Sequence, residues 1–143
     1  MPALSDTRVL LLASLREATG NAITAARLAE LIPAADVAML DINALADADA
    51  LNQHVHEHDV GLVLGIHAYR AGRLLVGCRV PCAIILGGTD MNVMMDDDAK
   101  RPVMLDALGQ AGAVVSFNGE LLRRLLEIVP EAEAKAFLVA QSI

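Results

Sequence analysis

The sequence predicts a single α/β domain over residues 1–143, with a Rossmann-like, doubly wound and mostly parallel sheet of about six strands and helices on both faces. Six short apolar runs, each as long as a strand buried on both faces, recur along the chain. Helical patterns separate most of these runs. No repeat, linker or low-complexity segment interrupts the alternation, which favours right-handed crossovers between parallel strands.

The elements follow in order along the chain. The apolar runs occupy residues 9–13, 37–40, 60–66, 83–86, 113–117 and 136–140. Apolar residues spaced i, i+3, i+4 and i+7 predict helices that include residues 25–32, 104–111 and 122–129. Pro33 and Pro130 end the first and the last of these helices, and residues 47–55 give a weaker helical signal.

Composition and charge exclude several functions. The chain is 55% hydrophobic but 2% aromatic, so its core must consist mainly of Leu, Val, Ile and Ala. A net charge of −7 repels phosphate backbones and anionic lipids, so we expect neither nucleic-acid nor membrane-surface binding. No apolar run is long enough to span a bilayer, and the N-terminus lacks a signal-peptide pattern. We therefore expect a cytoplasmic protein.

Ligands of such sheets bind at the carboxyl ends of the strands, which selects three strand-to-helix loops. In the first loop, Gly20, Asn21 and Thr24 stand where a helix begins, and free helix-start amides favour an anion. The alternative is a turn glycine followed by an Asn cap. Neither a dinucleotide G-x-G-x-x-G fingerprint nor a Walker loop is present.

The second loop places His67, Tyr69, Arg70 and Arg73 after the most apolar strand. Arginine offers a rigid fork for phosphate or carboxylate, and histidine titrates near neutral pH, so His67 and Arg70 are the candidate catalytic residues and Arg73 a binding residue. The alternative is a histidine at a helix start with two solvated arginines.

The third loop contains Gly87, Gly88, Thr89 and Asp90. Two glycines let the backbone approach a ligand closely, and Thr89 and Asp90 provide acceptors for sugar hydroxyls. The alternative is a plain turn with an Asp cap. We take all four as candidate binding residues.

Three further clusters are given ordinary structural interpretations. His54, His56 and His58 alternate along a predicted crossover, and no ligand set for a metal is completed there. The acidic run 96–98 precedes a helical pattern, where negative charge is favourable. Cys78 and Cys82 are expected to be a loop thiol and a buried strand thiol. No metal is expected.

The three loops, in this order, resemble glycosyltransferases with two Rossmann-like domains (the GT-B architecture, glycosyltransferase family 4-like), and most specifically the glycosyltransferase 1 domain-containing protein family. The matching segments are TGNAITAAR at 19–27, IHAYRAGRLL at 66–75, ILGGTDMN at 85–92 and, more weakly, VAQSI at 139–143. The likeness covers nearly the whole chain, from residue 8 to residue 143.

The resemblance implies a retaining transfer of a sugar from a nucleotide-diphosphate donor to a small acceptor, with no required metal or cofactor apart from the donor as co-substrate. This chain would be the N-terminal, acceptor-side domain. Gly20 and Asn21 would face the donor diphosphate, His67 and Arg70 would line the reaction centre, and Thr89 and Asp90 would contact sugar or acceptor groups.

The chain also departs from the family pattern. Many relatives carry a histidine where this chain has Gly87, so that role is lost or passes to His67. The C-terminal donor domain with its Glu-x7-Glu pattern lies outside these 143 residues, and we expect no turnover without it. One alternative is a non-catalytic binding or assembly module, which could form a homodimer. Within the transferase class, the alternative is an enzyme that forms selenosugars or thiosugars. A weaker alternative is a mononucleotide-binding or dehydrogenase-like domain.

Overall fold

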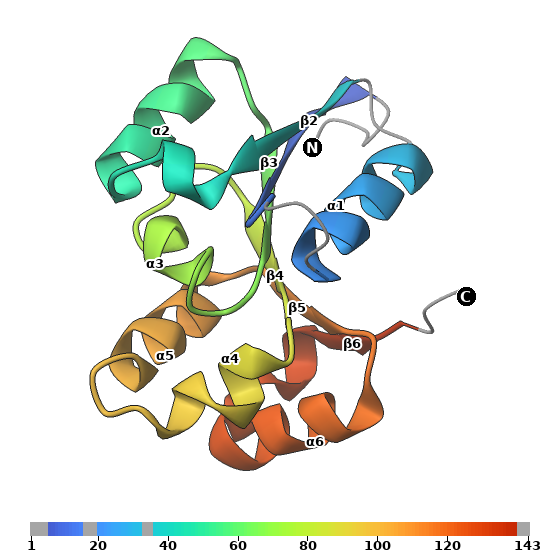
Figure 1. Ribbon diagram of the computed structural model, residues 1–143, viewed down its shortest axis with the longest axis vertical. Coiled ribbons are helices and arrows are strands. Elements are labelled where there is room, and N and C mark those ends of the chain that lie inside the picture. The colour runs from blue at the N-terminus through green and yellow to red at the C-terminus, as the bar shows by residue number, and fades with distance from the viewer. Residues whose placement is uncertain (1–5, 16–19, 33–35, 140–143) are drawn as a thin grey trace.

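The computed structural model of the chain is a six-stranded parallel sheet with helices packed around it (Figure 1). It describes residues 6–15, 20–32 and 36–139. The strands are β1 (Arg8–Ala13), β2 (Asp36–Asp41), β3 (Leu62–Ile66), β4 (Cys82–Ile85), β5 (Ala113–Ser116) and β6 (Ala136–Leu138). The predicted Rossmann-like α/β fold is confirmed.

The strand order is β2-β1-β3-β4-β5-β6, and every pair of neighbours is parallel. From β1 the chain moves outward to β2 and then crosses back to place β3 on the other side of β1. Leu11 of β1 is thus in register with both Met39 of β2 and Leu64 of β3. The order reverses between β1 and β3, which is where open α/β sheets bind ligands.

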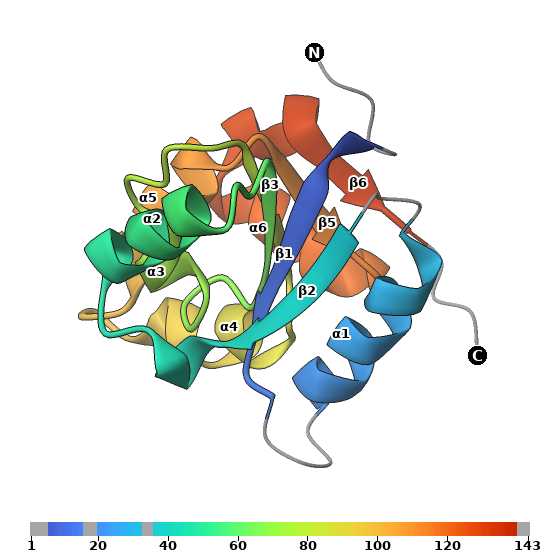
Figure 2. The same cartoon turned by 90° about the horizontal axis from the view of Figure 1, so that it is seen from above.

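Helices cover both faces of the sheet (Figure 2). They are α1 (Gly20–Leu31), α2 (Ala48–Glu57), α3 (Gly72–Leu75), α4 (Thr89–Asn92), α5 (Arg101–Gln110) and α6 (Gly119–Ile128), with 3-10 turns at Ile42–Ala44, Met94–Asp96 and Pro130–Lys135. The larger core cluster joins the sheet to α2 through α6. The smaller cluster joins α1 to the opposite face, around Ala25, Ile66 and Ile85.

Close packing of α3 on β3 positions the loop between them. A Cβ added at Gly65 would lie 2.7 Å from Leu75 Cδ1 and 3.0 Å from the Cβ of Ala71. The first contact is shorter than real Cβ contacts and the second is at their lower limit, so a side chain here would force Leu75 or Ala71 to shift and glycine lets α3 pack closely against β3. The two short elements therefore meet at a tight turn that contains His67.

The elements differ from the sequence prediction mainly at their ends. The third strand begins at Leu62 rather than at residue 60, because Val60 N still donates to Val55 O at the end of α2. The helix predicted at 47–55 is α2, and Asp47 is its N-cap. Helix α6 ends at Ile128, before Pro130, while Pro33 and residues 140–143 lie outside the described part of the chain.

The short helices α3 and α4 were not predicted, because one helical turn has no detectable period. Within the described ranges, no helix is both long and apolar enough to cross a membrane.

Candidate functional site

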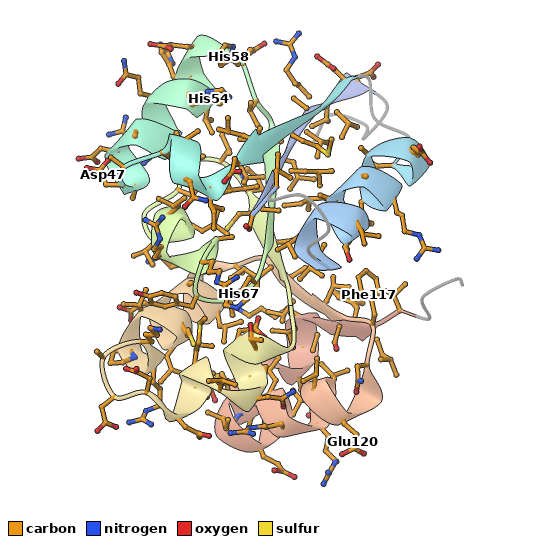
Figure 3. All side chains as sticks on the ribbon, viewed as in Figure 1. Asp47, His54, His58, His67, Phe117 and Glu120 are labelled. Carbon is orange, nitrogen blue, oxygen red and sulfur yellow. The ribbon has the colours of Figure 1, made fainter. Side chains whose placement is uncertain are left out.

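The three predicted loops follow β1, β3 and β4, which are neighbours in the parallel sheet. The loops therefore lie at the same edge of the sheet, the one formed by the carboxyl ends of the strands. The second and third loops are in direct contact through side chains of His67, Thr89 and Asp90. Figure 3 shows His67 where β3 ends, near the middle of the molecule. The structure therefore brings together the residues predicted in these two loops.

His67 holds an unusual backbone conformation, with φ of 93°. Residues other than glycine rarely adopt this backbone region, and the conformation costs about 1–3 kcal/mol of stability for each such residue. Compensating bonds are present: His67 N donates to Ile85 O at 2.8 Å, and its carbonyl accepts from Ala71 N and Gly72 N. The side chain, which is 1% exposed, makes three more hydrogen bonds.

The hydrogen bonds of His67 fix its tautomer. Its Nδ1 accepts from the amides of Tyr69 at 3.2 Å and Arg70 at 3.0 Å, so Nδ1 carries no proton. A neutral imidazole then has its proton on Nε2, which lies 2.9 Å from Thr89 Oγ1. Nε2 is therefore the donor and the Thr89 hydroxyl oxygen is the acceptor.

Electrostatics agree with a neutral ring. Burial is the largest cause that lowers the pKa of His67 below its ordinary value of 6.5. The charge of Asp90 opposes this effect, while Arg70 and Lys100 lower the pKa further. His67 thus acts as a fixed hydrogen-bond donor to Thr89. A direct catalytic contact of His67 with a substrate stays a prediction.

The carboxylate of Asp90 joins the second and third loops through hydrogen bonds to both. Its side chain is completely buried, and its carboxylate accepts four backbone amides. Oδ2 accepts from Ala68 N at 2.8 Å and Gly87 N at 2.9 Å, and Oδ1 from Gly88 N at 2.9 Å and Met91 N at 2.8 Å. Four amide donors match the acceptor capacity of an ionised carboxylate. In this arrangement the Asp90 oxygens face the backbone, and a sugar contact by Asp90 stays untested.

The glycines of the third loop have two different tasks. Gly88 has φ of 101°, which a side chain would strain, and it directly precedes α4. Gly87 is exposed, but its amide is already bonded to Asp90. Thr89 is an exposed residue of this loop, and its hydroxyl, which accepts from His67 Nε2, still has its own proton to donate.

Positive charge gathers beside Thr89 and His67. Arg70 is exposed and Lys100 is half-buried, and both are close enough to His67 to lower its pKa. Lys100 Nζ lies 5.3 Å from the centroid of the Tyr69 ring, a cation–π distance. In the part of the chain that the structure describes, Arg70, Arg73 and Lys100 form no salt bridge. These cations are suited to an anionic group.

The first loop lies at the same edge, although residues 16–19 are outside the described part of the chain. Helix α1 begins at Gly20, so Asn21 belongs to its first turn rather than being its cap. Thr24 follows one turn later and is half-buried. Ala25 packs against Ile66 and Ile85, which ties the start of α1 to the ends of β3 and β4.

Sequence reasoning missed two residues at this edge. Lys100 arrives from a segment far along the chain, and no local pattern indicated it. Asp41 ends β2 and binds the Asn43 amide at 2.9 Å, while its Oδ2 lies 3.4 Å from Leu15 N at the start of the first loop. An acidic residue directly after an apolar strand was the available signal for Asp41.

The other polar clusters take no part in the contacts between these loops. His54 in α2 and His58, the residue after its last turn, have ring centroids 4.1 Å apart and ring planes tilted by 50° (Figure 3). In the acidic run, Asp97 binds the amides of Ala99 and Lys100 just before α5. No group of three or more metal-ligating side chains occurs among the residues described.

No family model matches the chain. Among curated proteins it matches the Glycosyltransferase 1 domain-containing protein 1 of Xenopus tropicalis, with 32% identity over 137 residues. The match covers 95% of this chain but 40% of that relative, so the chain spans about two fifths of the length of the relative. The resemblance predicted from the loops is thus confirmed: the chain is similar in sequence to part of this protein.

Proposed function

We propose that this chain, as a homologue of a glycosyltransferase 1 domain-containing protein, is the acceptor-side domain of a glycosyltransferase. The reaction we propose is transfer of a sugar from a nucleotide-diphosphate donor to a small acceptor, with retention of anomeric configuration. The observation that carries the proposal is the joined pair of loops after β3 and β4, in which Thr89 and Arg70 are exposed residues at the carboxyl ends of the strands.

Departure of a nucleotide diphosphate leaves negative charge that preorganised donors and cations stabilise. Arg70 offers a guanidinium fork for that charge, and Thr89 offers one hydroxyl proton. His67 is a positioning residue in this scheme: because Nε2–H occupies one lone pair of Thr89 Oγ1, the hydroxyl proton must point elsewhere.

The start of α1 completes the proposed site. Gly20 and Asn21 form the first turn of a twelve-residue helix, whose unpaired amides and positive dipole end suit a diphosphate. Arg73, Gly87 and Gly88 would border the acceptor, with Asp90 holding the glycines in place. The proposal requires no metal, because cations and amides supply the positive charge. A thiol- or selenol-type acceptor is the variant of this proposal within the same class.

The proposal is tested in the complete natural polypeptide that contains these residues, by measuring nucleotide-diphosphate release from a panel of nucleotide sugars. Thr89→Val and Arg70→Gln are each expected to lower kcat/KM by roughly 10²-fold, the cost of losing one preorganised donor. Arg79→Gln is the matched control, because Arg79 is an exposed arginine at the opposite edge of the sheet. Turnover with Thr89→Val and Arg70→Gln at wild-type rates would contradict the proposed roles.

A second candidate is a non-catalytic assembly module. It is favoured by Phe137, Leu138 and Val139 at the edge strand, which are 53%, 58% and 44% exposed. Consecutive strand residues point to opposite faces of the sheet, so the edge strand β6 is apolar on both faces. Sedimentation equilibrium distinguishes the candidates: a homodimer that Phe137→Lys dissociates, with no turnover of any nucleotide sugar, would favour the module.

A further inference from the structure

A lysine from a distant part of the chain lies over an aromatic ring at the candidate site. Lys100 is the residue before α5, and its Nζ lies 5.3 Å from the centroid of the Tyr69 ring. The amide of Tyr69 donates to Nδ1 of His67 at 3.2 Å, and His67 Nε2 lies 2.9 Å from Thr89 Oγ1. A series of direct contacts therefore joins Lys100 to both loops of the candidate site.

The backbone that carries Lys100 is held on both sides. In the turn before α5, the Lys100 amide donates to Asp97 Oδ1 at 3.1 Å and to the Asp97 carbonyl at 3.2 Å. Helix α5 itself packs closely on α3, since a Cβ added at Gly72 would lie 3.0 Å from the Cβ of Ala107. The position of Lys100 over Tyr69 therefore follows from the packing of two helices and not from a loose side chain.

The ammonium of Lys100 is left without a carboxylate, although three aspartates precede it closely. Asp96 and Asp98 form salt bridges with arginines at 3.0 Å and 2.6 Å, and the side chain of Asp97 binds backbone amides. Within residues 6–15, 20–32 and 36–139, the Lys100 ammonium has neither a hydrogen bond nor a salt bridge. Each nearby carboxylate is thus engaged elsewhere.

An unpaired cation at this position is costly. Lys100 is half-buried, and removal of water from an ammonium costs free energy unless a partner compensates for it. The contact with the Tyr69 ring supplies only part of that compensation. The chain has a net charge of −7, so carboxylates are abundant, yet none is placed here. A bound anion is therefore the partner that this ammonium is suited to receive.

We propose that Lys100 binds a phosphate group on the acceptor, so that the reaction favours a phosphorylated acceptor over its unphosphorylated counterpart. This inference rests on the proposed function, because it names the acceptor class of the same site. A lysine ammonium is a compact point charge with three donors, which suits phosphate. A phosphate monoester carries up to two negative charges and three acceptor oxygens, so it compensates an unpaired ammonium more fully than a carboxylate does.

The first test uses the 143-residue chain with inorganic phosphate as the probe, so it does not depend on sugar transfer. The amide signals of Tyr69 and Arg70 are followed by NMR during a phosphate titration near neutral pH. Lys100→Met keeps an unbranched side chain beside the Tyr69 ring but removes the charge. It is expected to weaken phosphate binding by at least roughly tenfold, the cost of one hydrogen bond between charged groups. Lys100→Arg keeps the charge and should retain most of the binding.

Arg79→Gln is the matched control, because it removes the same charge from an exposed residue at the opposite edge of the sheet. Phosphate binding should be unaltered in this variant. Acetate, which carries one charge, is expected to bind the wild type more weakly than phosphate does. The proposal is overturned by equal phosphate affinities in the wild type and Lys100→Met, by equal losses in Lys100→Met and Arg79→Gln, or by acetate binding as tight as that of phosphate.

The second test uses the complete natural polypeptide with a panel of monosaccharide acceptors, each assayed beside its phosphate ester. The wild type should prefer the phosphate ester, and Lys100→Met should lower that preference by roughly tenfold, mainly through a higher KM for the ester. Sugar transfer at equal rates to both members of every pair would overturn the acceptor assignment while the proposed function stands. Phosphate binding at Lys100 in a polypeptide that transfers no sugar would contradict the proposed function itself.

Discussion

At the scale of single residues, His67 and Asp90 explain how two separate loops become one structure. His67 has a costly backbone conformation, and its ring is held by two amides and one hydroxyl. Asp90 accepts amides from both loops. Neither side chain is exposed, whereas the neighbouring residues Thr89 and Arg70 are, so the proposed ligand contacts are assigned to Thr89 and Arg70.

Replacement of Asp90 by Asn should destabilise the fold by about 2–4 kcal/mol, because each carboxylate oxygen now accepts two amides and the Asn NH₂ group that replaces one of them cannot accept any. Urea unfolding measures this loss. Asp97→Asn is the matched control: Asp97 also accepts two backbone amides, but it is fully exposed, so a far smaller loss is expected. Equal losses in both variants would contradict the role given to Asp90.

The pKa of His67 predicts how stability depends on pH. Because burial lowers this pKa below 6.5 in the folded state, the unfolded chain binds the proton more readily. The contribution of His67 is therefore fully present above pH 6.5 and is lost as the pH falls through the lowered pKa. We expect the free energy of unfolding to decline from neutral pH to about pH 5.

The pH prediction is checked by urea unfolding of the wild type and of His67→Asn across that range. Asn tolerates positive φ, so the variant is expected to fold with lower stability and a flatter pH dependence. His54, whose pKa burial also lowers, is retained in both proteins and cancels in the difference. Parallel pH curves for the two proteins would show that His67 does not carry the effect.

At the scale of elements, the contact of α3 with β3 determines the position of the His67 turn. Helix α3 has one turn and cannot be stable by itself. It is held because Leu74 and Leu75 are buried and because Gly65 lets them approach the strand. The site therefore depends on a glycine two residues before His67 that has no polar group of its own.

Gly65→Ala should destabilise the protein by about 1–3 kcal/mol, since the new methyl group would overlap Leu75 and Ala71. Gly109→Ala in α5 is the control, because nothing lies within 4 Å of the added Cβ. This control should gain about 0.5–1 kcal/mol from its helical position. Thermal or urea unfolding measures both changes, and a gain of stability in Gly65→Ala would show that α3 does not pack as described.

At the scale of the whole molecule, the two faces of the sheet are covered unequally. The larger core cluster extends over five helices, whereas the smaller one is built around α1. The exposed apolar edge at Phe137 and Leu138 belongs to β6, which has one neighbouring strand. The relative that the chain matches is more than twice as long as these 143 residues.

We expect residues 1–143 alone to show no measurable sugar transfer, because half of a cleft neither surrounds a donor sugar nor excludes water from it. The measurement is nucleotide-diphosphate release from a nucleotide-sugar panel, with the complete natural polypeptide assayed in parallel. Turnover by the 143 residues on their own would contradict the division of the site that we propose.

The order of strands and helices was predictable from the sequence, because apolar runs and helical periods are local patterns. The runs at 9–13 and 83–86 are buried on both faces, as their composition indicates. Single-turn helices such as α3 and α4 have too few residues to show a period, so they were not predictable in this way.

For the candidate site, the sequence by itself determined which loops carry polar residues, and so predicted ligand binding at the carboxyl ends of the strands. Only the tertiary structure decided the task of each residue. Asp90 and Thr89 are adjacent in sequence and equally polar, yet one is completely buried under backbone amides and the other is exposed. Their different roles come from hydrogen bonds to residues 22 positions earlier in the chain: Asp90 binds the Ala68 amide, and Thr89 binds the His67 ring. A local pattern does not contain such partners, because only folding brings them together.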